Sequence, residues 1–265
     1  FTMLPATVAE DEIVIEMEEP VDVELGIEVV EEEIEGVDDR ALSLENADLE
    51  LEGLEDNLLT SEVEGQAQAI MSTNGDNDFE IDEDGVLTKY NGYANDVIIP
   101  NGVKKIADYT FSFDKNISSV VIPDSVTIIG LGAFTHCSNL TKIIIPDSVI
   151  EIGGSAFDMS GLISVKLPKY LKGIDYGLFT NCFQLEEVII PDSIEYVGEW
   201  AFFGCHNLKN VILPDGITSI GEKTFSSCSA LESVTIPASV TTIDRTAFES
   251  CNKDLIIRGI DGSEA

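Results

Sequence analysis

Five cysteines and two histidines are the residues whose chemistry could build a site in this chain of 265 residues. The cysteines each lie fourteen residues after a proline: Cys137, Cys182, Cys205, Cys228 and Cys251. A zinc site would need paired Cys-x-x-Cys motifs or a Cys/His cluster, and the sequence contains neither. His136 and His206 occupy different positions relative to the prolines, so neither is placed repeatedly beside a thiol nucleophile. The pattern predicts neither a zinc centre nor thiol catalysis.

An acid-rich stretch near residue 80 is a weak metal candidate. Glu80, Asp82 and Asp84 occupy the first, third and fifth places of a calcium-binding loop, and Gly85 occupies the sixth. The twelfth place is Asn91, whereas such loops use a bidentate glutamate there. The match to a calcium loop is therefore partial.

The same stretch also fits a β-hairpin. A turn at residues 82–85 would join a strand at residues 79–81 to a second strand at residues 86–90. Such a hairpin would cap the first repeat of the chain and shield its exposed edge. We favour this interpretation over the calcium loop.

Composition excludes several classes of function. The 50 acidic side chains outnumber the 14 basic ones, so the formal net charge of −36 would repel nucleic-acid phosphates. No stretch of eighteen apolar residues occurs, and no membrane-spanning helix is expected. The sequence also lacks a phosphate-binding loop and any nucleophile, base and orienting group at usable spacing. We expect no enzyme activity and no cofactor.

The acidic charge is concentrated in the first 75 residues. This segment has 23 Asp and Glu against one basic residue, Arg40, and alternates acids with aliphatic side chains. Self-repulsion at that density predicts a disordered acidic leader over residues 10–75. Residues 1–9 are apolar and end in small residues, which is typical of the end of a secretory signal peptide.

The rest of the chain is a repeat of about 23 residues. Prolines recur at positions 100, 123, 146, 168, 191, 214 and 237. A phenylalanine follows each proline by eleven residues: Phe111, Phe134, Phe157, Phe179, Phe202, Phe225 and Phe248. Aliphatic residues stand three and six places after each proline. A unit of this size cannot form its own core, so each copy must stack on its neighbours.

The segment before each proline predicts a strand. It is rich in β-branched residues, as in residues 140–145 and 185–190, and proline ends it because it cannot donate to the ladder. A second short extended segment follows, and the remaining stretch has room for a helical turn or two. We therefore expect a solenoid of parallel, stacked short strands with short helical turns, an α/β, β-rich superhelix.

The repeat unit reads I-P-x-x-V-x-x-I-G-x-x-A-F-x-x-C-x-x-L-x-x-V-x. It resembles the BspA-like leucine-rich repeats of bacterial surface proteins over residues 79–260. The resemblance implies a leucine-rich-repeat solenoid and a secreted or surface-attached protein without a catalytic centre. It also implies that the partners are extracellular or surface proteins, such as those of the host matrix or of neighbouring cells. One unit departs from the pattern, because residues 146–167 are one residue short and carry Ser160 in the cysteine position.

Within such a solenoid, consecutive cysteines would lie one coil apart. That spacing is compatible with disulfide bonds. The side chains would all point the same way into a packed column, however, and we therefore favour buried thiols.

Alternation along the main strands predicts an outward-facing partner surface. If Val188 points inward, then Glu187 and Ile189 point outward. The resulting candidates for partner binding are Val121, Ile144, Lys166, Glu187, Ile189, Ile212 and Thr235. An exposed aliphatic stripe rimmed by polar groups is typical of an interface. β-Branched residues also simply suit a parallel sheet, so both readings stay open.

The expected organisation has four parts. Residues 1–9 are a signal-peptide remnant, 10–75 the acidic leader, 76–98 a capping hairpin, and 99–265 a solenoid of seven units. The last strand is followed by no polar cap, and we expect the sequence to be a fragment that lacks the start of its signal peptide and its C-terminal cap. The main hypothesis is a non-catalytic binding module; the alternative is a scaffold or accessory segment of a larger secreted enzyme.

Overall fold

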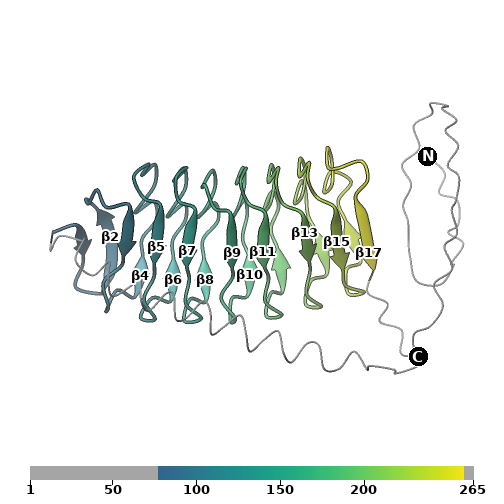
Figure 1. Ribbon diagram of the computed structural model, residues 1–265. Helices are drawn as coiled ribbons and strands as arrows, with labels where there is room; N and C mark the ends of the chain where they lie inside the picture. The colour runs from purple at the N-terminus through teal and green to yellow at the C-terminus, as the bar shows by residue number, and fades with distance from the viewer. Residues whose placement is uncertain (1–76, 260–265) are drawn as a thin grey trace, which may run out of the picture. The chain divides into compact units, whose positions relative to one another are not determined.

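The computed structural model describes residues 77–259, all of which belong to one compact unit. In this part the chain winds through a series of stacked coils, each with two short strands joined by turns (Figure 1). The predicted signal remnant, the acidic leader and the end of the solenoid after residue 259 lie outside the described residues. The solenoid of parallel strands is confirmed.

One row of strands is formed by the segments that precede the prolines. Its members are β3 (Asp96–Ile98), β5 (Ser119–Val121), β7 (Lys142–Ile144), β9 (Ser164–Lys166), β11 (Glu187–Ile189), β13 (Asn210–Ile212), β15 (Ser233–Ile236) and β17 (Ile256–Gly259). Paired strands are parallel and align equivalent repeat positions, such as Val120 opposite Ile143. The hydrogen-bonded groups are β3-β5-β7, β9-β11 and β13-β15-β17. The first interruption falls at the unit that is one residue short.

A second row is formed by shorter strands. Its members are β1 (Phe79–Ile81), β2 (Val86–Tyr90), β4 (Lys105–Ile106), β6 (Ile128–Ile129), β8 (Glu151–Ile152), β10 (Gly173–Ile174), β12 (Tyr196–Val197), β14 (Ser219–Ile220) and β16 (Thr242–Ile243). β1 pairs antiparallel with β2, in a hairpin with the strand bounds that the sequence predicts. β2 then pairs parallel with β4 of the first coil. The hairpin thus covers the edge of this row, as a cap would.

The expected helical turns are wrong for the described residues, none of which forms a helix. Positions nine and thirteen after the prolines hold a left-handed backbone, which ends any α-helix. These residues are Tyr109, Phe113, Gly132, His136, Ser155, Met159, Gly177, Asn181, Trp200, Gly204, Lys223, Ser227 and Ser250. Most of them are not glycine, so residue type did not reveal the conformation.

Hydrogen bonding explains why turns replace helix here. Backbone N–H groups alternate between a partner in the same turn and a partner in the next coil. The Thr135 N–H donates to the Gly132 carbonyl at 3.0 Å, whereas the Phe134 N–H donates to the Ala156 carbonyl at 2.8 Å. Half of the donors are thereby used to join coils, which an α-helix would not allow.

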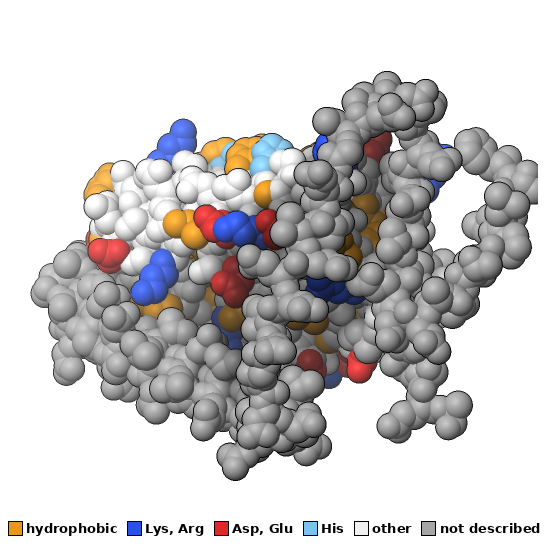
Figure 2. Space-filling model, turned by 45° about the vertical axis from the view of Figure 1, so that its right-hand side comes forward, with side chains coloured by type: hydrophobic (Ala, Val, Ile, Leu, Met, Phe, Trp, Pro, Cys, Tyr) orange, Lys and Arg blue, Asp and Glu red, His pale blue; other side chains and the backbone are white. Residues whose placement is uncertain are grey.

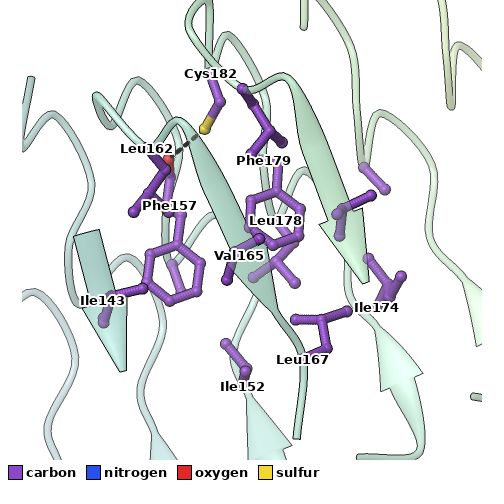
Figure 3. Close-up of a cluster of buried hydrophobic side chains, with 14 of the residues drawn as sticks. Ile143, Ile152, Phe157, Leu162, Val165, Leu167, Ile174, Leu178, Phe179 and Cys182 are labelled. Carbon is purple, nitrogen blue, oxygen red and sulfur yellow. Dashed lines mark hydrogen bonds between the residues drawn. The ribbon is translucent and has the colours of Figure 1, made fainter. Parts of the chain in front are cut away.

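The phenylalanines form one continuous column inside the solenoid. Ring centroids of successive residues from Phe111 to Phe248 lie 4.9–5.7 Å apart, with interplanar angles of 15° or less. Figure 3 shows Phe157 and Phe179 in this column, beside Leu178 and Val165. Offset ring stacks add about 0.5–1.5 kcal/mol per pair to the free energy gained from burial. The column holds equivalent positions of the repeat in line.

Candidate functional site

The five cysteines are free thiols that line a second internal column. Each thiol donates to the carbonyl of a phenylalanine in the preceding coil; Cys182 Sγ lies 3.0 Å from the Phe157 oxygen (Figure 3). Burial raises the pKa of the Cys137 and Cys182 thiols to about 12. A protonated thiol is a poor nucleophile, so this column serves packing and hydrogen bonding.

The calcium candidates are engaged in the hairpin. The Asp82 carboxylate accepts the backbone N–H groups of Asp84 and Val86 at 3.0 and 2.9 Å. Glu80 accepts a hydrogen bond from Asn91 at 2.8 Å, which lowers the pKa of its carboxyl, with a smaller contribution from Lys89. No group of three potential metal ligands gathers within residues 77–259. The hairpin interpretation accounts for Glu80 and Asp82.

The strand face is the name we give to Val121, Ile144, Lys166, Glu187, Ile189, Ile212 and Thr235. Their backbone register brings the predicted candidates side by side: Val121 pairs with Ile144, and Ile189 with Lys166. Lys166 and Glu187 are exposed, while Val121, Ile144 and Thr235 are half-buried. All seven candidates therefore point away from the core, as alternation predicts.

Exposure of the isoleucines on the strand face increases from Ile144 to Ile212. The Ile189 side chain is 46% exposed and that of Ile212 is 68% exposed. These two isoleucines lie on the neighbouring strands β11 and β13. A polar rim runs beside them, where Lys209 Nζ meets Glu186 Oε2 at 2.6 Å. An apolar centre with a charged rim has the chemistry of a protein interface.

Sequence reasoning did not identify a second exposed surface, which we call the crest. It consists of Phe113, His136, Met159, Phe183 and His206, on the turns that follow the phenylalanine column; His136 is half-buried and the other four are exposed. The ring of Phe113 stacks on that of His136 with 4.3 Å between the ring centroids, and the ring of Phe183 stacks on that of His206 with 5.1 Å between the centroids. Figure 2 shows histidine atoms beside hydrophobic atoms along the upper edge of the described coils. A comparison of the same repeat positions across the units could have identified the crest. Most other units carry polar or small residues at the positions where these units carry aromatic, histidine or methionine side chains.

Comparison with protein families decides the identity of the repeat. The model of the BspA type leucine-rich repeat region matches in six copies, over residues 89–207 and 127–256. This chain belongs to the BspA-type leucine-rich repeat family. The family consists of bacterial surface proteins that are generally not enzymes. The resemblance predicted from the 23-residue unit is thereby confirmed.

Several solved structures are similar to this BspA-type chain. A leucine-rich repeat protein of T. pallidum is 22% identical, with a TM-score of 0.44, over 71% of this chain and 86% of that one. A leucine rich cell surface protein of Faecalibacterium prausnitzii is 21% identical, with a TM-score of 0.34, over 72% and 95%. The pneumococcal vaccine antigen PcpA is 18% identical, with a TM-score of 0.33, over 69% and 72%. No curated protein sequence matches the chain.

Membrane insertion by a helix finds no support in the part of this BspA-type chain that the structure describes. No helix there is long and apolar enough to cross a bilayer.

Proposed function

We propose that the solenoid is a non-catalytic, extracellular protein-binding module that acts in adhesion or in contact with host or cell-surface proteins. Its location is outside the cell or at the cell surface. Membership of a family of bacterial surface proteins supports both parts of this proposal.

The observation that carries the proposal is the exposed pair Ile189 and Ile212 on the strand face. Each side chain is held on a strand of a parallel sheet, β11 paired with β9 and β13 paired with β15, so little conformational entropy is lost when a partner docks. Scattered exposed aliphatic residues are ordinary, but here they recur on adjacent coils beside charged groups. This arrangement fits a partner protein with an apolar centre and a polar edge.

The test is capture of biotinylated host-cell surface proteins and matrix proteins by the immobilised full chain. We expect the triple variant Ile144→Lys/Ile189→Lys/Ile212→Lys to lose most of the bound protein, because three charges would be desolvated at the interface.

A matched control places three lysines on or directly before β14 and β16 of the other row of strands: Thr218→Lys/Ser219→Lys/Thr242→Lys. These positions are exposed, and the net charge changes by the same amount. The control should capture as much protein as the wild type. Equal capture by a stably folded strand-face variant would overturn the proposal.

A further inference from the structure

The two halves of the surface around the strand face differ in charge. Around β11, β13 and β15, residues 184–193, 207–216 and 230–239 hold five carboxylates and one ammonium group: Glu186, Glu187, Asp192, Asp215, Glu232 and Lys209. We call this part, together with the exposed Ile189 and Ile212, the acidic half. Around β5, β7 and β9, residues 116–125, 139–148 and 162–170 hold three lysines and two aspartates: Lys142, Lys166, Lys169, Asp124 and Asp147. All of these charged residues are exposed.

Carboxylates lie on both sides of the exposed isoleucines. Glu187 precedes Ile189 by two residues on β11, so alternation puts both side chains on the same face of the strand. Asp192 and Asp215 follow Ile189 and Ile212 by three residues each, in the turn after the strand. The rise of an extended chain keeps each of these residues within about 10 Å of its isoleucine. The apolar pair therefore lies between negative charges.

Three of these carboxylates have no role in holding the described coils together. Within residues 77–259, the side chains of Glu187, Asp192 and Asp215 form no hydrogen bond and no ion pair. Aspartate after proline is common in turns, and the Asp147 carboxylate does serve its turn by accepting the Lys169 N–H at 2.8 Å. The equivalent Asp192 and Asp215 accept no such bond, so turn structure does not account for their charge.

The one lysine of the acidic half offsets only part of its charge. Lys209 Nζ donates to Glu186 Oε2 at 2.6 Å, and this hydrogen bond raises the pKa of Lys209. The charge of Glu232 on the next coil contributes to the same increase, so Lys209 interacts with both glutamates. A single ammonium group cannot neutralise two carboxylates. This edge of the acidic half therefore also keeps a net negative charge.

The electrostatic potentials of these carboxylates add to one another. Asp192 and Asp215 occupy the same repeat position in adjacent coils, and stacked strands lie about 4.8 Å apart. This spacing is below the screening length of about 10 Å in 0.1 M salt. Lys166, which pairs with Ile189 across β9 and β11, marks the boundary with the lysine-bearing half. A basic group of a partner is thus attracted to one half of the face and repelled by the other.

We propose that the acidic half binds a segment of a partner protein that has an apolar centre and lysine or arginine side chains beside it. The apolar centre covers Ile189 and Ile212, and the basic groups lie against Glu187, Asp192 and Asp215. These rim contacts stay hydrated, so they contribute mainly to specificity and to the rate of association. The inference rests on the proposed function, because it gives the chemistry of the partner for the same face.

NMR spectroscopy of the full chain with ¹³C-labelled isoleucine methyl groups tests this proposal. The probe is the peptide acetyl-Leu-Ser-Leu-Ser-Lys-Gly-Lys-amide, and we expect saturable shifts of the Ile189 and Ile212 signals with a Kd on the order of a millimolar. The matched peptide with glutamate in place of both lysines should bind about fivefold more weakly or worse. Added salt should weaken binding of the lysine peptide. The fully buried Ile152 serves as an internal reference that neither peptide should shift.

A charge-neutralised variant makes the outcome specific. Glu187→Gln/Asp192→Asn/Asp215→Asn should weaken binding of the lysine peptide about fivefold, because three exposed ion pairs are lost. The control Glu83→Gln/Glu199→Gln/Glu222→Gln changes the net charge by the same amount at exposed positions outside the acidic half, and should bind as the wild type does.

Two sets of outcomes separate this proposal from the proposed function. Equal binding of the two peptides, unchanged binding by the charge-neutralised variant, or the absence of saturable shifts at Ile189 and Ile212 would overturn the preference for a basic partner. The proposed function fails in a different experiment, when the strand-face lysine variant captures surface proteins as well as the wild type does.

Discussion

The rings of Phe157 and Phe179 stack 5.6 Å apart with an interplanar angle of 10°, although only 22 residues separate them. Every other neighbouring pair in the column is 23 residues apart. The missing residue falls in the loop at Gly161, so the column continues without a shift. The hydrogen-bonded strand ladder is interrupted between β7 and β9, and again between β11 and β13, where the units have their full 23 residues. The phenylalanine column and the backbone hydrogen bonds of the turns, such as the Phe157 N–H to the Leu178 carbonyl at 3.1 Å, keep the coils aligned across the short unit.

The phenylalanine column should dominate stability. Phe179 is fully buried, and Phe179→Ala should lower the free energy of unfolding by about 3–5 kcal/mol, because it leaves a cavity in the column. Urea denaturation followed by circular dichroism measures this. The matched control is the exposed Phe113→Ala, which should change stability by about 0.5 kcal/mol or less. Equal effects of the two substitutions would argue against the packing account.

Gly161 should tolerate no larger residue. Gly161→Ala should destabilise the protein by about 1–3 kcal/mol, because the added methyl group meets the Ser138 backbone. Gly221→Ala is the control, since the nearest atom to its added methyl group belongs to the flexible Glu199 side chain. Thermal unfolding of both variants would measure the difference. A Gly161→Ala protein as stable as the control would show that the loop can move.

Buried thiols should make stability fall in alkali. Burial raises the pKa of Cys182 from 9.0 to about 12, so the folded thiol keeps its proton where the unfolded one loses it. Unfolding then releases a proton, and the stability due to this group declines as pH rises from 9.0 towards 12. Between pH 8 and pH 10, the difference in unfolding free energy between wild type and Cys182→Ala should shrink by about 1.4 kcal/mol. Parallel pH profiles of the two proteins would contradict this.

The acidic hairpin should owe its stability to hydrogen bonds within the turn. Asp82→Ala removes an acceptor for two backbone N–H groups and should destabilise the hairpin by about 1 kcal/mol. Hydrogen exchange of the Val86 amide should report faster local opening. Calcium should protect neither the wild type nor the variant, and a calcium-dependent slowing of this exchange would revive the calcium-loop interpretation.

The periodic features of this fold could be predicted from sequence. Proline spacing located the strands, and the phenylalanines at constant spacing predicted the column. Alternation also gave the outward direction of Ile189 and Ile212, because strand geometry leaves only two faces. The hairpin strands at residues 79–81 and 86–90 followed from turn residues between β-branched segments.

The turns could not be predicted in the same way. Left-handed backbone at Phe113 and His136 is unusual for these residue types, so a short helical turn was the more natural expectation. The one-residue deletion in residues 146–167 could be seen in the sequence. The conformation of the shortened loop depended on how it packs against the coil before it, which the sequence does not give. A hollow on the crest follows from the short loop at Gly161 and is lined by residues of four consecutive units.

The most direct test of the account is the Kd for a captured surface protein, measured with the full chain by surface plasmon resonance. The account predicts that Ile144→Lys/Ile189→Lys/Ile212→Lys weakens binding by about a hundredfold, as expected when hot-spot residues are lost. The control Thr218→Lys/Ser219→Lys/Thr242→Lys should bind within about twofold of the wild type. A strand-face variant that is folded and binds as tightly as this control would contradict the account.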